Sequence, residues 1–237
     1  MKTRELETPI EQRYFENTPH PQTDIEFGTR EMGILHPFII SGGSNTERWY
    51  FKHINSLTEY KFNLKPEYFA DESDYTNAFP RRINEILSAN PDAKIFCVFD
   101  WDTIYGNKTR ISKHKDFIDK FKSEISKEIV IICQSMPCIE YWFLLHFENY
   151  TDLLKNYSKV STHLAPHIKK CFPISTIKMK KLLKKEEYLK DATWVKNLIA
   201  DEKLSLAIQR AETNIKNAIK DETLNNRSYS FVYRIFK

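Results

Sequence analysis

The stretch Ile95-Phe-Cys-Val-Phe-Asp-Trp-Asp-Thr103 decides how this chain folds, because it joins an apolar run to two acids. An uninterrupted apolar run is typical of a strand buried on both faces of a parallel sheet. Asp100 and Asp102 follow it, and the carboxyl ends of parallel strands open into the ligand crevice of α/β folds. On an extended chain, residues two apart project to the same side, roughly 6–7 Å apart. Both carboxylates could then face one hydrated Mg²⁺ or Mn²⁺ ion, or two neighbouring ions. A strand followed by an ordinary acidic turn is the alternative interpretation.

The segments around this strand alternate between strand and helix patterns. Short apolar runs bounded by turn residues predict strands at 37–41, 62–69, 95–103 and 128–135. Helical spacing of apolar residues predicts helices at 46–55, 75–89, 109–127 and 137–147. Gly42 and Gly43 predict a tight loop after the first strand, because glycine permits positive φ. This alternation predicts an α/β fold with a four-stranded, mainly parallel sheet flanked by helices.

The pattern changes on both sides of this α/β core, which we place at residues 36–149. Residues 1–35 are polar and rich in proline, which predicts an N-terminal extension. Residues 150–237 predict a C-terminal helical region, with helices at 153–157, 163–170, 174–189, 192–199 and 203–220. The apolar segment 229–236 is expected to dock back on the core.

The amino-acid composition restricts the class of protein but does not identify its function. The 237 residues carry a net charge of +4, which is too mild to establish nucleic-acid binding unless the basic residues cluster. One cluster is the run Ile177–Lys185, which fits either a phosphate-contacting face or an ordinary solvated helix face. Its lysines are Lys178, Lys180, Lys181, Lys184 and Lys185. Four cysteines without a C-x-x-C pair predict reduced thiols, and no segment resembles a signal peptide or membrane span, which predicts a cytoplasmic protein.

A second group of basic residues lies just after the two loops that flank the expected crevice. These are the expected phosphate-contacting residues: Lys52, His53, Lys108, Arg110 and Lys113. They would position DNA or RNA rather than read its sequence.

Other histidines fit structural roles better than chemical ones. His146 follows the apolar run Tyr141–Leu145, which predicts a core histidine rather than a general base. His163, His167 and Cys171 are spaced four residues apart, which could suggest zinc. Ligands stacked along one helix do not converge tetrahedrally, so we expect no zinc there.

The segment Met136-Pro-Cys-Ile-Glu-Tyr-Trp-Phe-Leu-Leu-His-Phe147 carries a family resemblance. It resembles the block Asn-Pro-Cys-Phe-Glu-x-Trp-Leu-Leu-Leu-His-Phe of the RloB-like family of the TOPRIM superfamily. The resemblance covers residues 36–149 well and the helical remainder weakly. It implies a TOPRIM core, in which a glutamate after the first strand and the acid pair after the third gather Mg²⁺ for phosphodiester chemistry. It also implies a role in prokaryotic defence against phage, often beside an ATPase with an ABC or SMC-like head.

One departure from the family pattern bears directly on activity. The family's first motif resembles Val-Cys-Glu-Gly-Glu-x-Thr-Glu, whereas this chain has Ile40-Ser-Gly-Gly-Ser-Asn-Thr-Glu47. Gly42 stands where the superfamily glutamate is expected, and glycine offers neither a proton acceptor nor a metal ligand. Glu47, and Glu140 in the Met136–Phe147 segment, would have to compensate.

Three functions stay open on the sequence. In the first, Asp100, Asp102 and Glu47 bind Mg²⁺, Glu140 assists, and the protein is a nuclease with weakened activity. In the second, the site is degenerate, and the protein binds a nucleotide or nucleic acid as a regulatory subunit. In the third, the chain is a scaffold for its partner. Self-association or docking on the ATPase through the helical region is compatible with all three.

Overall fold

A mostly parallel sheet organises the computed structural model, which describes residues 36–42, 45–65, 78–172 and 183–237. All of these residues belong to one compact unit, Leu35–Lys237. Within them the sheet has five strands in the order β2-β1-β3-β4-β5. The strands are β1 (Phe38–Ser41), β2 (Asn63–Lys65), β3 (Ile95–Asp100), β4 (Val130–Met136) and β5 (Tyr229–Ser230). The first four are parallel, and β5 runs antiparallel to β4.

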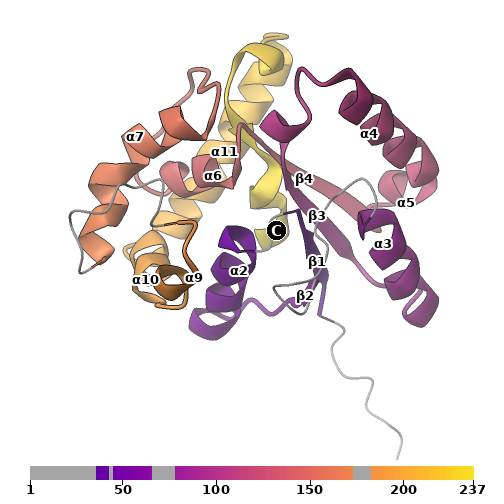
Figure 1. Ribbon diagram of the computed structural model, residues 1–237, viewed down its shortest axis with the longest axis horizontal. Coiled ribbons are helices and arrows are strands. Elements are labelled where there is room, and N and C mark those ends of the chain that lie inside the picture. The colour runs from indigo at the N-terminus through magenta and orange to yellow at the C-terminus, as the bar shows by residue number, and fades with distance from the viewer. Residues whose placement is uncertain (1–35, 43–44, 66–77, 173–182) are drawn as a thin grey trace, which may run out of the picture. The chain divides into compact units, whose positions relative to one another are not determined.

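Helices cover both faces of this sheet (Figure 1). Between the strands lie α2 (Thr46–Leu57), α3 (Ala78–Ala89), α4 (Lys108–Lys120), α5 (Lys122–Ser126) and α6 (Ile139–Leu145). The later helices are α7 (Tyr157–Ile168), α9 (Glu186–Leu189), α10 (Thr193–Ile199) and α11 (Lys203–Lys220). Four 3₁₀ helices complete the description: η1 (Trp101–Thr103), η2 (Lys169–Cys171), η3 (Leu224–Asn226) and η4 (Phe231–Phe236).

Alternating residues of the central strand β3 supply two separate cores. Phe96 and Val98 belong to the larger core, which also contains residues of α2, α6, α7, α10 and α11. Ile95, Cys97 and Phe99 face the smaller core, with residues of α3 and α4. A strand that is apolar on both sides is therefore buried on both faces, as its sequence predicts. The α/β class and the mainly parallel sheet are confirmed, and the arrangement is consistent with a TOPRIM-like fold.

The C-terminal segment returns to the sheet, as expected for residues 229–236. Tyr229 pairs with Met136 in the β4–β5 register, and the hydroxyl groups of Ser135 and Ser230 lie 2.8 Å apart. Val232, in η4, is buried in the larger core. The tail therefore adds a short fifth strand that the sequence patterns did not predict.

Several expected details are wrong. The β3 strand ends at Asp100 and the chain turns into η1, so Asp102 does not continue an extended strand. Pro137 precedes α6 instead of lying in its first turn, because the helix begins at Ile139. Residues 153–156 are not helical, and α7 begins at Tyr157.

Gly42 does not use the positive φ that glycine permits. Positive φ among the described glycines occurs at Gly106. A Cβ atom at Gly42 would instead lie 3.1 Å from the Cβ atom of Phe99 on β3. Close approach of β1 to β3 therefore explains the glycine. Gly43, the N-terminal extension and the lysines at 178, 180 and 181 lie outside the described residues.

Candidate active site

Four acidic side chains come together beyond the carboxyl ends of three parallel strands. Glu47 lies in the first turn of α2, which follows β1, and Glu140 lies in the first turn of α6, which follows β4. Asp100 ends β3, and Asp102 lies in η1 directly after it. The loops at this edge of the sheet therefore gather the four acids predicted from the sequence.

Mutual repulsion and burial show that these acids share one site. Burial raises the pKa of Asp100 well above its usual range, and the negative charges of Glu47, Glu140 and Asp102 raise it further. Burial also raises the pKa of Glu47. Asp102 is less buried, and desolvation followed by the charge of Glu140 raises its pKa to about 6. The cluster concentrates negative charge where water does not screen it well.

Backbone hydrogen bonds fix the acid pair on β3 and η1. The Oδ1 atom of Asp100 accepts a hydrogen bond of 2.8 Å from the backbone N–H of Ile139. The backbone N–H of Asp102 donates to the carbonyl of Pro137 at 3.1 Å. These two bonds tie the end of β3 to the start of α6, so the family-like segment 136–147 positions the acid pair.

Glu140 is the most deeply buried acid of the cluster. Its side chain has no exposed surface, and its Oε1 atom lies 3.1 Å from the Nζ atom of Lys184. Its Oε2 atom has no hydrogen-bond partner. A buried carboxylate oxygen without a partner is costly, and this one lies in a cluster that repels its charge.

The donor set fits a hard divalent cation. Carboxylate oxygens are the ligands that Mg²⁺ prefers, and a cation would relieve the repulsion around Asp100 and satisfy Glu140. Among the described residues, no three His, Cys, Asp or Glu side chains form a group that could hold a metal by themselves. A Mg²⁺ ion at this site would therefore be held by one or two carboxylates and by water, which is how proteins usually bind this ion.

The expected phosphate-contacting residues fall into two classes. Lys52, Lys108 and Lys113 are exposed, and Arg110 donates from Nη1 to the carbonyl of Thr103 at 2.6 Å. His53 is buried, and its Nε2 atom lies 2.7 Å from the carbonyl oxygen of Leu189. His53 therefore anchors α2 against the later helices and does not reach a surface where phosphate could bind.

His146 has the structural role expected of it. Its Nδ1 atom lies 2.7 Å from the carbonyl oxygen of Leu198, and burial lowers its pKa to about 3. The imidazole is therefore neutral at physiological pH. Its ring packs against the ring of Trp142 in a T-shaped arrangement inside the larger core.

His163, His167 and Cys171 do not converge on a point. His163 lies 3.8 Å from a carboxylate oxygen of Glu148, whereas His167 stacks on Phe147 with ring centroids 4.6 Å apart. All four cysteines of the chain are free thiols. His167 and Cys171 instead line a hollow of about 440 Å³ together with Phe147, Lys170, Thr193, Asn197 and Lys203.

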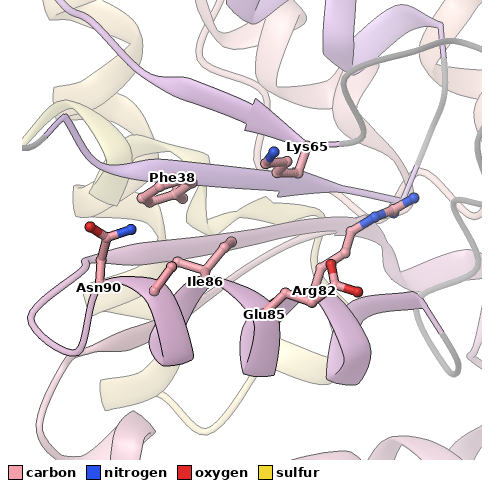
Figure 2. Close-up of a pocket in the computed structure, with 7 residues that line it drawn as sticks. Phe38, Lys65, Arg82, Glu85, Ile86 and Asn90 are labelled. Atoms are coloured by element: carbon pink, nitrogen blue, oxygen red, sulfur yellow. The ribbon is translucent and has the colours of Figure 1, made fainter.

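Another hollow, of about 200 Å³, lies between the sheet and α3. Figure 2 shows Phe38, Ile86 and Asn90 gathered toward one end of it and Arg82 and Glu85 toward the other. It contains none of the four acids. The charge of the acid cluster and its place in the fold identify it.

Comparison with known proteins places the chain in the same family as the motifs do. The model of the RloB family, described as RloB-like protein, matches residues 38–237. The chain belongs to the RloB-like family. The match includes the RloB-like segment 136–147 and also the C-terminal helices, where the motif resemblance is weak. No curated protein and no solved structure matches the chain. Among the described helices, none combines the length and apolar character needed to cross a bilayer.

Lys184 is the residue of the site that the motifs did not single out. In the sequence it is one lysine of a basic run, and 44 positions separate it from Glu140. Only the packing of the later segment against α2 and α6 brings it to the acids. No spacing rule connects two residues so far apart.

Proposed function

We propose that this RloB-like protein is a Mg²⁺-dependent nuclease that hydrolyses phosphodiester bonds of DNA or RNA in prokaryotic defence against phage. The observation that supports this most strongly is the convergence of Glu47, Asp100, Asp102 and Glu140 at the carboxyl edge of a parallel sheet. Two of these acids are fully or almost fully buried, yet they repel each other. Such an arrangement is unfavourable for stability and is typical of sites that act on a charged ligand.

Each side chain has a defined part in this chemistry. Asp100 is held by the Ile139 amide and Asp102 stands closer to solvent, so this pair can receive the cation at the mouth of the site. Bound Mg²⁺ would polarise the phosphoryl group and supply an activated water. Without a cation, burial and the charge of Glu140 raise the pKa of Asp102 to about 6, and a bound cation would favour its ionised form instead. Lys52, Lys108 and Lys113 are exposed and would hold the flanking phosphates.

Because the first motif lacks its glutamate, we expect a lower nuclease activity. Gly42 offers no ligand, so Glu47, in the first turn of α2, supplies the negative charge on that side of the cluster. Glu47 is buried and close enough to Asp100 to raise its pKa. We therefore expect a slower nuclease rather than an inactive one.

A regulatory role is the second candidate, and Gly42 is the observation that favours it. In that role the acid cluster would bind a cation together with a nucleotide or nucleic acid and would not cleave it. The protein would then act as a subunit of a defence complex, beside an ABC- or SMC-like ATPase or as a homo-oligomer.

A cleavage assay separates the two candidates. Supercoiled plasmid, single-stranded DNA and RNA are incubated with the full chain in Mg²⁺, Mn²⁺ or EDTA, both alone and with an ATPase partner. Asp100→Asn keeps the shape of the side chain and should reduce metal-dependent cleavage at least about a hundredfold. Asp119→Asn alters an exposed acid on α4 and should leave cleavage unchanged. Metal-dependent binding without cleavage would favour the regulatory role, and cleavage unchanged in Asp100→Asn would contradict the nuclease proposal.

A further inference from the structure

An ion pair joins the acid cluster to a segment far away in the sequence. The Nζ atom of Lys184 lies 3.1 Å from Oε1 of Glu140. The lysine side chain is 52% exposed and the glutamate side chain is 0% exposed. One partner is thus fixed in the core, while the other reaches it from the surface. Because an ammonium on a four-carbon stem is flexible, Lys184 can leave this position without disturbing the packed core.

The backbone beside Lys184 is fastened to the same site. The hydroxyl of Thr46 donates a buried hydrogen bond of 2.5 Å to the carbonyl oxygen of Leu183. Thr46 precedes Glu47 on α2, so the anchor lies next to one of the four acids. The ammonium also lies 5.0 Å from the ring centroid of Tyr157 on α7. The fold therefore holds the ammonium against Glu140 on α6 and Tyr157 on α7, while the backbone next to it is bonded to α2.

The charge of Lys184 acts on more than one member of the cluster. It interacts electrostatically with Glu47 and Asp100 as well as with Glu140. It nevertheless satisfies only one oxygen of Glu140, because Oε2 has no partner. Within the described residues, Lys184 thus neutralises part of the negative charge of the acid cluster. A divalent cation would neutralise more of it.

We propose that Lys184 is the resident counter-ion of the acid cluster, and that it competes with a divalent cation and thereby sets the affinity of the site for metal. This inference rests on the proposed function, since it assumes that the cluster binds metal. It assigns to the C-terminal helical region a direct influence on the site. When metal binds, the ammonium moves toward solvent, where it faces the phosphates of an incoming nucleic acid.

Mn²⁺ binding to the full chain tests the competition. Affinity is measured without nucleic acid, by titration calorimetry and by the electron paramagnetic resonance signal of free Mn²⁺. Lys184→Met keeps the length of the stem and removes the charge, so Mn²⁺ should bind about tenfold more tightly or better. Lys184→Arg keeps the charge and should bind as the wild type does. Lys185→Met is the matched control, because Lys185 is also 52% exposed but pairs with Glu187 instead; it should change affinity less than about twofold.

Thermal unfolding gives a second readout that a purely structural lysine would not reproduce. Without metal, Lys184→Met leaves Glu140 buried and unpaired, so it should unfold at a lower temperature than the wild type. Saturating Mn²⁺ should remove most of that difference, because the ion takes over the compensation. A loss of stability that Mn²⁺ does not repair would mean that Lys184 only holds the fold together.

The outcomes also separate this inference from the nuclease proposal. Mn²⁺ binding that is equal or weaker in Lys184→Met than in the wild type overturns the competition and leaves the metal site intact. Mn²⁺ binding that is unchanged in Asp100→Asn shows that the ion binds elsewhere and overturns the proposed site. If neither the wild type nor Lys184→Met binds Mn²⁺, both proposals fail. Should Lys184→Met not fold, Lys184→Gln supplies the same loss of charge with a polar end.

Discussion

The carboxylate of Asp100 accepts a 2.8 Å hydrogen bond from the backbone N–H of Ile139, the first residue of α6. This bond joins the acid at the end of β3 to the RloB-like segment that begins at Met136. It explains why that segment and the acid pair occur together: the segment holds Asp100 in place. Glu140, the next residue, then enters the same cluster from the first turn of α6.

The pH dependence of stability should reveal the repulsion within the cluster. The pKa of Asp102 is raised from 3.8 to about 6 in the folded protein, mainly by burial. The folded state therefore holds this proton longer than the unfolded state, and stability is lost as pH rises from about 4 to about 6. Asp102→Asn does not titrate, so without metal it should gain stability relative to the wild type over this range. Urea denaturation at pH 4, 5, 6 and 7 measures the difference; a constant difference would contradict it.

His146 should contribute to stability and not to chemistry. His146→Ala removes a buried ring and its interaction with Leu198, which we expect to cost about 2–4 kcal/mol in the free energy of unfolding. Because the pKa of His146 is lowered to about 3, its contribution is lost as pH falls below about 6.5. The cost should therefore be smaller at pH 5 than at pH 8. Any cleavage activity of the folded variant should match the wild type, and a selective loss of activity would instead indicate a general base.

Substitutions at Gly42 test whether the missing acid limits activity. Gly42→Ala places a Cβ atom 3.1 Å from that of Phe99 and should destabilise the protein by about 1–2 kcal/mol. Gly42→Glu meets the same steric cost but restores the acid of the family motif. Metal-dependent cleavage should rise in Gly42→Glu and not in Gly42→Ala. Equal activity in the two variants would show that this position no longer matters for cleavage.

The Thr46 anchor should be needed for the position of Lys184. Thr46→Val has nearly the same shape but leaves the carbonyl of Leu183 unsatisfied, at a cost of about 1–3 kcal/mol. Thr46→Ser keeps the hydroxyl and is the control. If Lys184 competes with metal, Thr46→Val should also bind Mn²⁺ more tightly than Thr46→Ser does. Calorimetric titration of both variants measures this.

Charge reversal should weaken nucleic-acid binding in a salt-dependent way. Lys108 and Lys113 are exposed on α4, close to the loop that carries the acid pair. Each phosphate contact contributes about 0.7–0.9 to the slope of log K against log salt, so Lys108→Glu should reduce that slope by about one. Arg110→Glu should reduce it too, and it also removes the bond to Thr103. Lys94→Glu makes the same change in net charge at the amino end of β3, away from the acids, and serves as the control. A slope unchanged in Lys108→Glu and Arg110→Glu would show that α4 does not contact phosphate.

Much of the fold and the four acids followed from the sequence by itself. The run Ile95–Phe99 has no polar residue, so a strand made of it is stable only when both of its faces are shielded from water. Such strands are typical of parallel sheets with helices on both faces, and the sequence therefore predicted one. The end of this strand predicted Asp100 and Asp102 as a pair at the carboxyl edge of the sheet, whereas Glu47 and Glu140 were added by the resemblance to the RloB-like family. The boundaries of α11, Lys203–Lys220, were also predicted, because its apolar residues repeat at helical spacing.

Tertiary structure alone decided how those residues are used. The turn into η1 that separates Asp102 from the strand depends on a hydrogen bond to Pro137, which lies on another strand-to-helix connection. His53 follows the loop after β1, where a phosphate ligand was expected, but it lies on α2 and packing against Leu189 buries it. Lys184 reaches Glu140 only because the segment at 183–184 packs against α2 and α6. Local patterns determine elements and their faces, whereas contacts between residues distant in sequence arise from packing of the whole core, and no short-range rule encodes them.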